Sequence, residues 1–135
     1  MADSSLARKM KRKPEARAAI VGAPAGYEAA SFPGLEPASS SLTGGFDWVQ
    51  LFVQNKAQLD KLAPKAVKAL RPGSILWISF PKGSSKIQTD LSRDHGWEIV
   101  RSLDLKWLTL ISVNETWSAF AFRLYKPGEA HRSQC

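Results

Sequence analysis

A short polar turn, Pro81-Lys82-Gly83-Ser84-Ser85-Lys86, follows an apolar run and combines the side chains that proteins use to bind anions. Its lysines supply positive charge and its serines supply hydroxyl donors. Backbone N–H groups around a glycine can line a concavity that holds a phosphate or a carboxylate. A turn of this composition also lets any chain leave a strand at the surface. The residues of the turn leave both interpretations open.

Catalytic chemistry finds less support. His95 could be combined with Ser84 or Ser85 and with Asp90 or Asp94 as a triad, but the chain has no G-x-S-x-G elbow, and an exposed histidine is the simpler interpretation. Two histidines and one cysteine make no metal site. We therefore predict neither catalytic residues nor a metal, and the sequence leaves any cofactor unknown.

Apolar runs predict five strands, and two further segments have helical character. We expect strands over residues 18–21, 46–53, 75–80, 105–113 and 118–125, with helices over 55–70 and 89–102. Pro64 predicts a kink or a fresh start in the first helix. Strand–helix–strand units form parallel pairs, whereas the short linker before the last strand predicts an antiparallel hairpin. The expected class is α/β, a three-layer Rossmann-like open sheet of about five strands, mostly parallel with one antiparallel strand.

Ligands of open α/β sheets bind beyond the carboxyl ends of the strands, so the loops at that edge are the candidate site. We call this edge the rim. Glu115 is its best candidate for an acid or base, and Trp117 is expected in a turn at the rim rather than within a strand. A small anionic molecule is the ligand that this chemistry favours, and the site is predicted to be non-catalytic. The candidate rim residues are Pro24, Gly26, Tyr27, Lys56, Pro81, Lys82, Gly83, Ser84, Ser85, Lys86, Glu115 and Trp117.

The second half of the chain resembles the second half of an S-adenosylmethionine-dependent methyltransferase fold. The resemblance rests on Leu70-Arg71-Pro72-Gly73-Ser74, the strand that follows, a helix and a terminal hairpin. It implies the strand order 1-2-3-5-4, with the last strand between the third and the fourth. Strands two and three of the methyltransferase fold have no counterpart in this chain.

Four motifs in order look more specific: Gly22-Ala23-Pro24-x-Gly26-Tyr27, Phe46-Asp47-x-Val49-x-Leu51-Phe52-Val53, Leu76-Trp77-x-x-x-Pro81-Lys82 and Glu115-Thr116-Trp117-Ser118-Ala119. Together they are similar to a family of small bacterial proteins catalogued as a domain of unknown function. The resemblance spans roughly residues 6–125. It implies a truncated methyltransferase-like shape without an established activity.

Methyltransferases of this fold hold their cofactor with a glycine-rich turn after strand one and a carboxylate at the end of strand two. Here Pro24 interrupts the turn, and Glu28 and Glu36 are the only acids in residues 28–45. Two alternatives to the ligand-binding module stay open. One is a degenerate or divergent S-adenosylmethionine-dependent methyltransferase. The other is a self-associating interaction protein, possible as a homodimer, because the missing strands expose the flank of strand one.

Length and charge divide the chain into three parts. The chain has 135 residues and a net charge of +7, and we expect a basic, flexible arm over 1–17, one α/β domain over 18–126 and a polar tail over 127–135. The arm could contact nucleic acid through phosphates, or simply be solvated. The single cysteine, Cys135, fits a reducing compartment and hence the cytoplasm. No apolar run is long enough for a membrane span.

Overall fold

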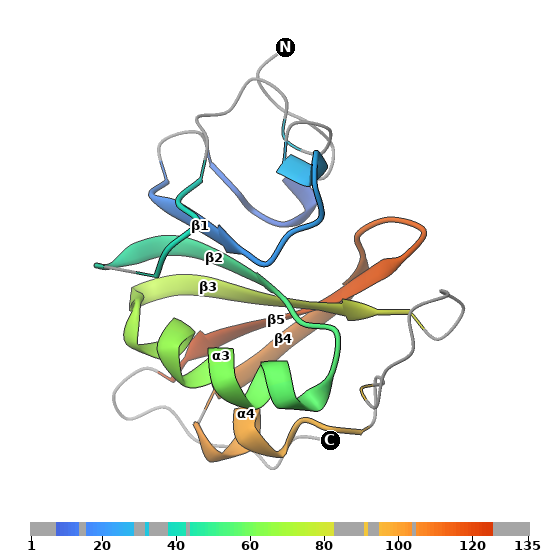
Figure 1. Cartoon of the computed structure of the whole chain (residues 1–135). Coiled ribbons are helices and arrows are strands. Elements are labelled where there is room, and N and C mark those ends of the chain that lie inside the picture. The colour runs from blue at the N-terminus through green and yellow to red at the C-terminus, as the bar shows by residue number, and fades with distance from the viewer. Residues whose placement is uncertain are drawn as a thin grey trace.

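The computed structural model describes residues 8–13, 16–28, 32, 38–42, 44–82, 91, 95–103 and 105–125. Strands and helices follow one another in the order that the sequence predicts (Figure 1). They are β1 (Ala18–Val21), β2 (Phe46–Phe52), α3 (Lys56–Lys68), β3 (Leu70–Pro81), α4 (Glu98–Ser102), β4 (Leu105–Ser112) and β5 (Trp117–Leu124).

The strands form one sheet in the order β1-β2-β3-β5-β4, which confirms the predicted insertion of the last strand. The pairs β1–β2 and β2–β3 are parallel, whereas β5 runs antiparallel to both β3 and β4. Counted by pairings, the sheet is therefore mixed rather than mostly parallel, because β5 separates β3 from β4. The carboxyl ends of β1, β2, β3 and β4 still point to the same edge.

The outer edge of β1 is bridged by Ser39. Ser39 forms a parallel bridge with Ala19, in which Ile20 N–H donates to the Ser39 carbonyl over 2.8 Å and Ser39 N–H donates to the Ala18 carbonyl over 2.9 Å. A strand of the larger methyltransferase sheet would pair at this edge. In the described residues, one bridging residue takes its place.

The first predicted helix forms as a single element. Asn55 caps α3 by accepting the N–H of Gln58 over 2.9 Å, and the helix continues through Pro64 to Lys68 without a second start. Pro64 removes only the hydrogen bond that its nitrogen would donate to the Asp60 carbonyl. Leu59 and Ala63 lie on the buried face, so packing against the sheet offsets that loss.

Two boundaries differ from the sequence prediction. β3 begins at Leu70, five residues earlier than expected, and its register against β2 shifts between the pairs Phe46–Leu70 and Trp48–Ile75. Gly73 takes a positive φ of 85° in this irregular stretch, and the Ser74 hydroxyl donates to the Phe46 carbonyl over 2.7 Å. A Pro-Gly pair thus marks an irregular strand here rather than a loop. The second helix, α4, spans only Glu98–Ser102 in the described residues.

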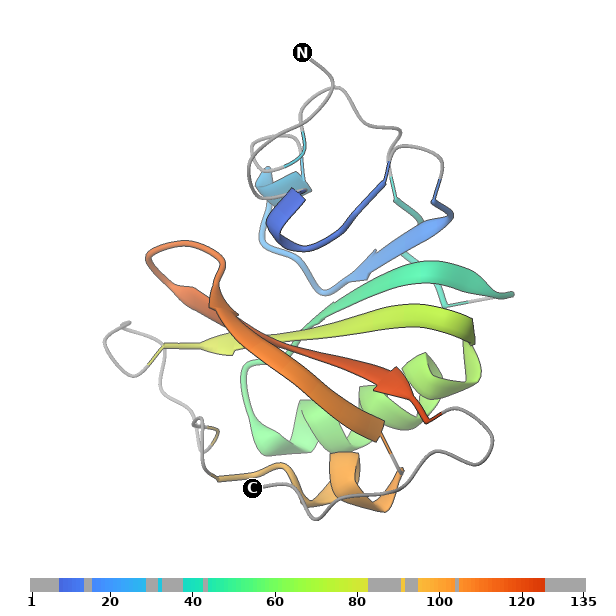
Figure 2. The ribbon, with the colours of Figure 1, turned by 180° about the vertical axis from the view of Figure 1, so that it is seen from behind.

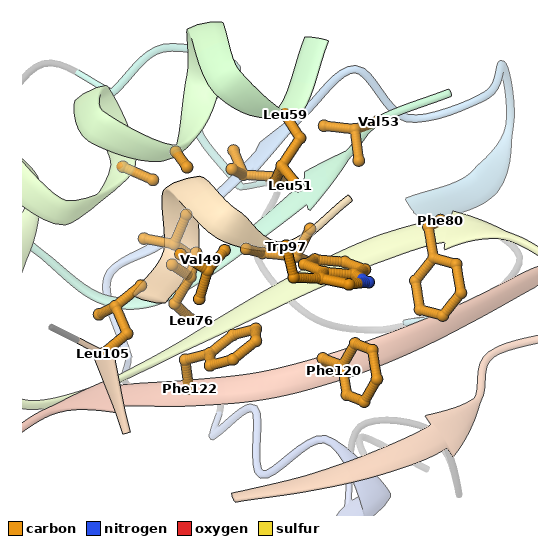
Figure 3. Close-up of a cluster of buried hydrophobic side chains, with 14 of the residues drawn as sticks. Val49, Leu51, Val53, Leu59, Leu76, Phe80, Trp97, Leu105, Phe120 and Phe122 are labelled. Carbon is orange, nitrogen blue, oxygen red and sulfur yellow. The ribbon is translucent and has the colours of Figure 1, made fainter. Parts of the chain in front are cut away.

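Helices cover one face of the sheet, and the N-terminal segment, residues 8–13, covers the other together with residues 22–28 that follow β1 (Figures 1 and 2). On the helix side, Leu59 of α3 packs toward Leu51, and Trp97 makes edge contacts with Phe80 and Phe120 at ring distances of 5.3 and 5.0 Å (Figure 3). The opposite face has its own buried cluster. Among the described residues, the second covering layer of the expected three-layer architecture is formed by this segment and the residues that follow β1.

The N-terminal segment, which falls within the arm predicted over residues 1–17, is docked on the sheet. Met10 is completely buried, and its carbonyl oxygen accepts the indole N–H groups of Trp48 at 2.8 Å and Trp77 at 2.9 Å. A buried indole N–H needs an acceptor, and neighbouring strands present two of them here. One backbone carbonyl satisfies both. Among the described helices, none is long and apolar enough to cross a membrane.

Candidate functional site

Lys82 connects two of the loops that the sequence places at the rim. Its backbone N–H donates to the Thr116 carbonyl over 2.8 Å, and its Nζ donates to the Ser112 hydroxyl over 2.7 Å. The exit of β3 therefore lies against the connection between β4 and β5. Gly83, Ser84, Ser85 and Lys86 fall outside the described residues, so the predicted anion-binding concavity of that turn stays a prediction.

A lysine that the sequence did not single out reaches the same place. Lys9 Nζ donates to the carbonyl oxygen of Ser112 over 3.1 Å. Ser112 thus accepts one lysine ammonium on its backbone and another, from Lys82, on its side chain. No local signal places Lys9 here, because 103 residues separate it from Ser112. The only hint in the sequence is the basic character of the N-terminal segment.

The two candidate rim residues on the β4–β5 connection differ in their exposure to solvent. The Asn114 side-chain oxygen accepts the N–H groups of Thr116 and Trp117 at 2.9 and 3.0 Å, which holds the turn tightly. Glu115 is exposed at this turn. Trp117, by contrast, begins β5, is buried and packs edge-on against Phe52 at a ring distance of 5.0 Å. Trp117 is a core residue, because its side chain points to the face covered by the N-terminal segment.

The turn after β1 keeps two features of a close-packed glycine loop. Gly22 has a φ of 80°, and a Cβ atom at this position would lie 2.8 Å from the Phe52 carbonyl oxygen. Gly26 also has a positive φ, of 77°. These positions require glycine for backbone reasons alone. Pro24 and Gly26 are exposed, and their place in a ligand site stays a prediction.

Tyr27 is buried in the sheet face instead of lining the rim. Its hydroxyl donates to Gln50 Oε1 over 3.0 Å, and Gln50 Nε2 donates to the Ser79 hydroxyl over 2.9 Å. Gln50 and Ser79 are fully buried on neighbouring strands. This polar chain anchors the turn after β1 to β2 and β3, so Tyr27 acts in packing.

The two candidate rim residues that remain, Pro81 and Lys56, are also held by the fold. Pro81 is buried at the end of β3, and Lys56 forms an ion pair with Asp60 at 2.9 Å, one helical turn further along α3. His95 is exposed. Within the described residues, no three His, Cys, Asp or Glu side chains gather as a metal site would require.

Glu28 is the one carboxylate among the described residues of 28–42, and it holds two segments together. Its Oε2 lies 3.0 Å from Arg12 Nη2 and accepts the N–H of Ala38. The Arg12 guanidinium also lies over the rings of Phe32 and Trp48, at 4.6 and 5.3 Å. Arg12 is almost fully buried, so this pair ties the N-terminal segment to the loop that follows β1.

Solved structures with a similar fold include methyltransferases and a protein in complex with S-adenosylmethionine. A ribosomal protein L11 methylase from Lactobacillus delbrueckii subsp. bulgaricus matches 90% of this chain with a TM-score of 0.59 and 13% identity, over 76% of its own length. A TehB-like SAM-dependent methyltransferase from Corynebacterium glutamicum matches 89% with a TM-score of 0.54 and 12% identity, over 85% of its length.

LepI in complex with SAM matches 89% of the chain with a TM-score of 0.54 and 15% identity, and the chain spans only 39% of LepI. No protein-family model and no curated protein sequence matches the chain. At these identities the comparisons establish a methyltransferase-like α/β fold, and the fold alone.

The residues present do not fit S-adenosylmethionine as such folds hold it. Ser39 occupies the place where strand two would pair with β1, and Ser40, Ser41 and Leu42 follow it, so the described residues supply no carboxylate at the end of that strand. Glu28 already binds Arg12 and the Ala38 amide. The ribose hydroxyls of the cofactor would therefore lack their usual acceptor among the described residues.

Proposed function

We propose that this chain is a degenerate S-adenosylmethionine-dependent methyltransferase domain that keeps the fold without the methyl-transfer activity. The observation that carries the proposal is that, within the described residues, Ser39 alone pairs with the outer edge of β1, together with the engagement of Glu28 by Arg12. The similarity of the sheet to methyltransferases supports the first half of the proposal. No residue of this chain is assigned a catalytic role.

Calorimetric titration with S-adenosylmethionine and S-adenosylhomocysteine tests this proposal. We expect no saturable binding with a Kd below about 1 mM, because a site that lacks its ribose acceptor loses interactions that a cofactor needs. An active methyltransferase titrated under the same conditions is the positive control. Binding in the micromolar range, with amide shifts at Gly22 and Gly26, would overturn the proposal.

A second candidate function, non-catalytic binding of a small anion at the rim, is favoured by the meeting of Lys9 and Lys82 at Ser112. Two ammonium groups held by one residue create a positive site at the edge where α/β sheets bind ligands. The double variant Lys9→Gln/Lys82→Gln should weaken binding of ADP or inorganic phosphate. Lys61→Gln/Lys65→Gln, which removes two exposed charges from α3, is the matched control. Equal affinities in the two variants would argue against a rim site.

A further inference from the structure

A cavity of about 450 Å³ lies between the N-terminal segment and the sheet, away from the rim. Asp47 and Trp48 at the start of β2 line it, as do residues 73–75 near the start of β3. The rim lies at the opposite ends of these two strands. A cavity of this size accommodates a small organic molecule.

Basic side chains from two distant parts of the chain line the cavity. Lys11 and Lys13 come from the N-terminal segment, and Arg123 comes from β5. Arg123 Nη1 donates to the Leu124 carbonyl over 3.0 Å, which holds the guanidinium beside the end of β5. Three cations from two distant parts of the chain contribute positive potential to one cavity.

The single acidic residue of the lining, Asp47, already interacts with Arg17 and Arg71. One carboxylate oxygen accepts the backbone N–H of Arg17 over 3.0 Å, and the other pairs with Arg71 Nη1 at 3.3 Å. Asp47 therefore compensates Arg71 rather than the lysines of the cavity. The lining keeps an excess of positive charge.

The other walls offer apolar surface. Trp48, Ile75 and Leu108 line the cavity, and the Trp48 indole N–H is already donated to the Met10 carbonyl. The hydroxyl of Ser74, a further lining residue, donates to the Phe46 carbonyl and accepts the Arg71 N–H at 2.8 Å. Because Trp48 is almost completely buried, the accessible apolar surface comes mainly from Ile75 and Leu108, and the lining combines cationic donors with an aliphatic surface. A bare inorganic ion would leave that surface in contact with water.

We propose that this cavity binds an amphipathic organic anion. Its carboxylate, sulfonate or phosphate group lies against Lys11, Lys13 and Arg123, and its apolar body lies against Ile75 and Leu108. The inference goes beyond the proposed function, because it needs neither the rim nor S-adenosylmethionine. The cavity proposal can therefore be correct or wrong independently of the proposed function.

The probe for the test is 8-anilinonaphthalene-1-sulfonate, which joins an aromatic body to one negative charge. Binding is followed by fluorescence and by the indole N–H signals in ¹⁵N-correlated NMR spectra. Trp48 reports on the cavity, and Trp97, which belongs to the helix-side cluster, is an internal control on the other face (Figure 3). Trp97→Phe assigns the control signal.

Two variants separate the charge of the cavity from its space. Lys11→Gln/Lys13→Gln removes charge, and Lys61→Gln/Lys65→Gln removes the same charge from exposed positions of α3. Leu108→Trp fills part of the cavity and keeps every cation. We expect the first variant and Leu108→Trp each to weaken binding by about tenfold or more, while the control changes it by less than about twofold.

A saturable shift at Trp48 with an unmoved Trp97, together with both losses of affinity, supports the proposal. It is overturned if the probe does not bind, if Trp97 shifts equally, or if the Lys61/Lys65 control loses as much affinity as Lys11→Gln/Lys13→Gln. Unchanged affinity in either cavity variant also overturns it. Displacement of the probe by inorganic phosphate at equal concentration would contradict the apolar half of the site.

Discussion

At the scale of single residues, Glu28 joins two segments on the sheet face that the N-terminal segment covers. Its carboxylate binds the nearly buried guanidinium of Arg12 and the backbone of Ala38. Removing one partner of a buried pair leaves an uncompensated charge, which costs about 3–5 kcal/mol in fully buried cases. The Glu28 side chain is 29% exposed, so we expect Glu28→Gln to lower the free energy of unfolding by about 2–3 kcal/mol.

Urea denaturation measures this effect, and the chain provides a matched control. Lys56 and Asp60 form an ion pair on α3 in which both side chains are substantially exposed, at 39% and 41%. Asp60→Asn should therefore cost only about 0.5 kcal/mol or less. Similar losses for Glu28→Gln and Asp60→Asn would mean that the Arg12 pair is solvated and does not fix the N-terminal segment.

Tyr27 supports a second prediction at this scale. Tyr27→Phe removes the donor to Gln50 Oε1 and leaves a fully buried amide oxygen without that bond. An unsatisfied buried acceptor costs about 1–3 kcal/mol, and the loss should appear as a lower urea midpoint with an unchanged slope. Tyr125→Phe, at a half-buried position just after β5, is the control. A loss below about 0.5 kcal/mol would show that Gln50 repacks or finds water.

Tyr27 and Trp117 also show where reasoning from single residues stops. Both follow or begin a strand at the rim edge, so their place along the chain was predictable. The direction of each side chain was not, because the covered face is built from partners distant in sequence: Phe52 and Gln50 for Tyr27, and Phe52 for Trp117. For Lys82, by contrast, the local sequence pattern alone predicted a position at the rim.

At the scale of elements, hydrophobic pattern predicted the parts that bury regular faces. The strand Ala18–Val21 follows from an uninterrupted apolar run, and the face of α3 with Leu59 and Ala63 follows from helical spacing. The start of β3 at Leu70 was not predicted, because a Pro-Gly pair such as Pro72-Gly73 normally ends an element. Here the pair lies within an irregular strand. Residues 8–13 contain one large apolar side chain, Met10, and their main anchor is a backbone carbonyl that no sequence pattern reveals.

The docked segment leads to a prediction of its own. Deleting residues 1–13 removes the acceptor of two buried indole N–H groups and uncovers Trp48 and Trp77. We expect the truncated chain to lose its near-ultraviolet circular dichroism and to lower its melting temperature. Deleting residues 1–7 alone keeps Met10 and Arg12 and serves as the control. If the chain that lacks residues 1–13 has the same melting temperature as the full chain, a structural role for the segment is contradicted.

At the scale of the whole molecule, the sheet resembles a methyltransferase sheet, and within the described residues Ser39 alone pairs with the outer edge of β1. The resemblance stated from sequence gave the strand order, and the structural comparisons support the same fold. An open strand edge invites pairing with another chain, which is why self-association was an alternative from the start. The bridge of Ser39 to β1 bears directly on that alternative, because it occupies donors and acceptors that a second copy would otherwise pair with.

Opening that edge tests whether Ser39 prevents self-association. Ser39→Pro removes the N–H that donates to the Ala18 carbonyl, and a proline at this position cannot restore the bond. We expect the wild-type chain to remain monomeric in light scattering and Ser39→Pro to gain mass with rising concentration. Ser40→Pro alters the neighbouring exposed residue without removing a bond to β1, so it should behave like the wild type. If Ser39→Pro stays monomeric, then the bridge is not what protects the edge; if the wild type already associates, β1 pairs with a partner despite it.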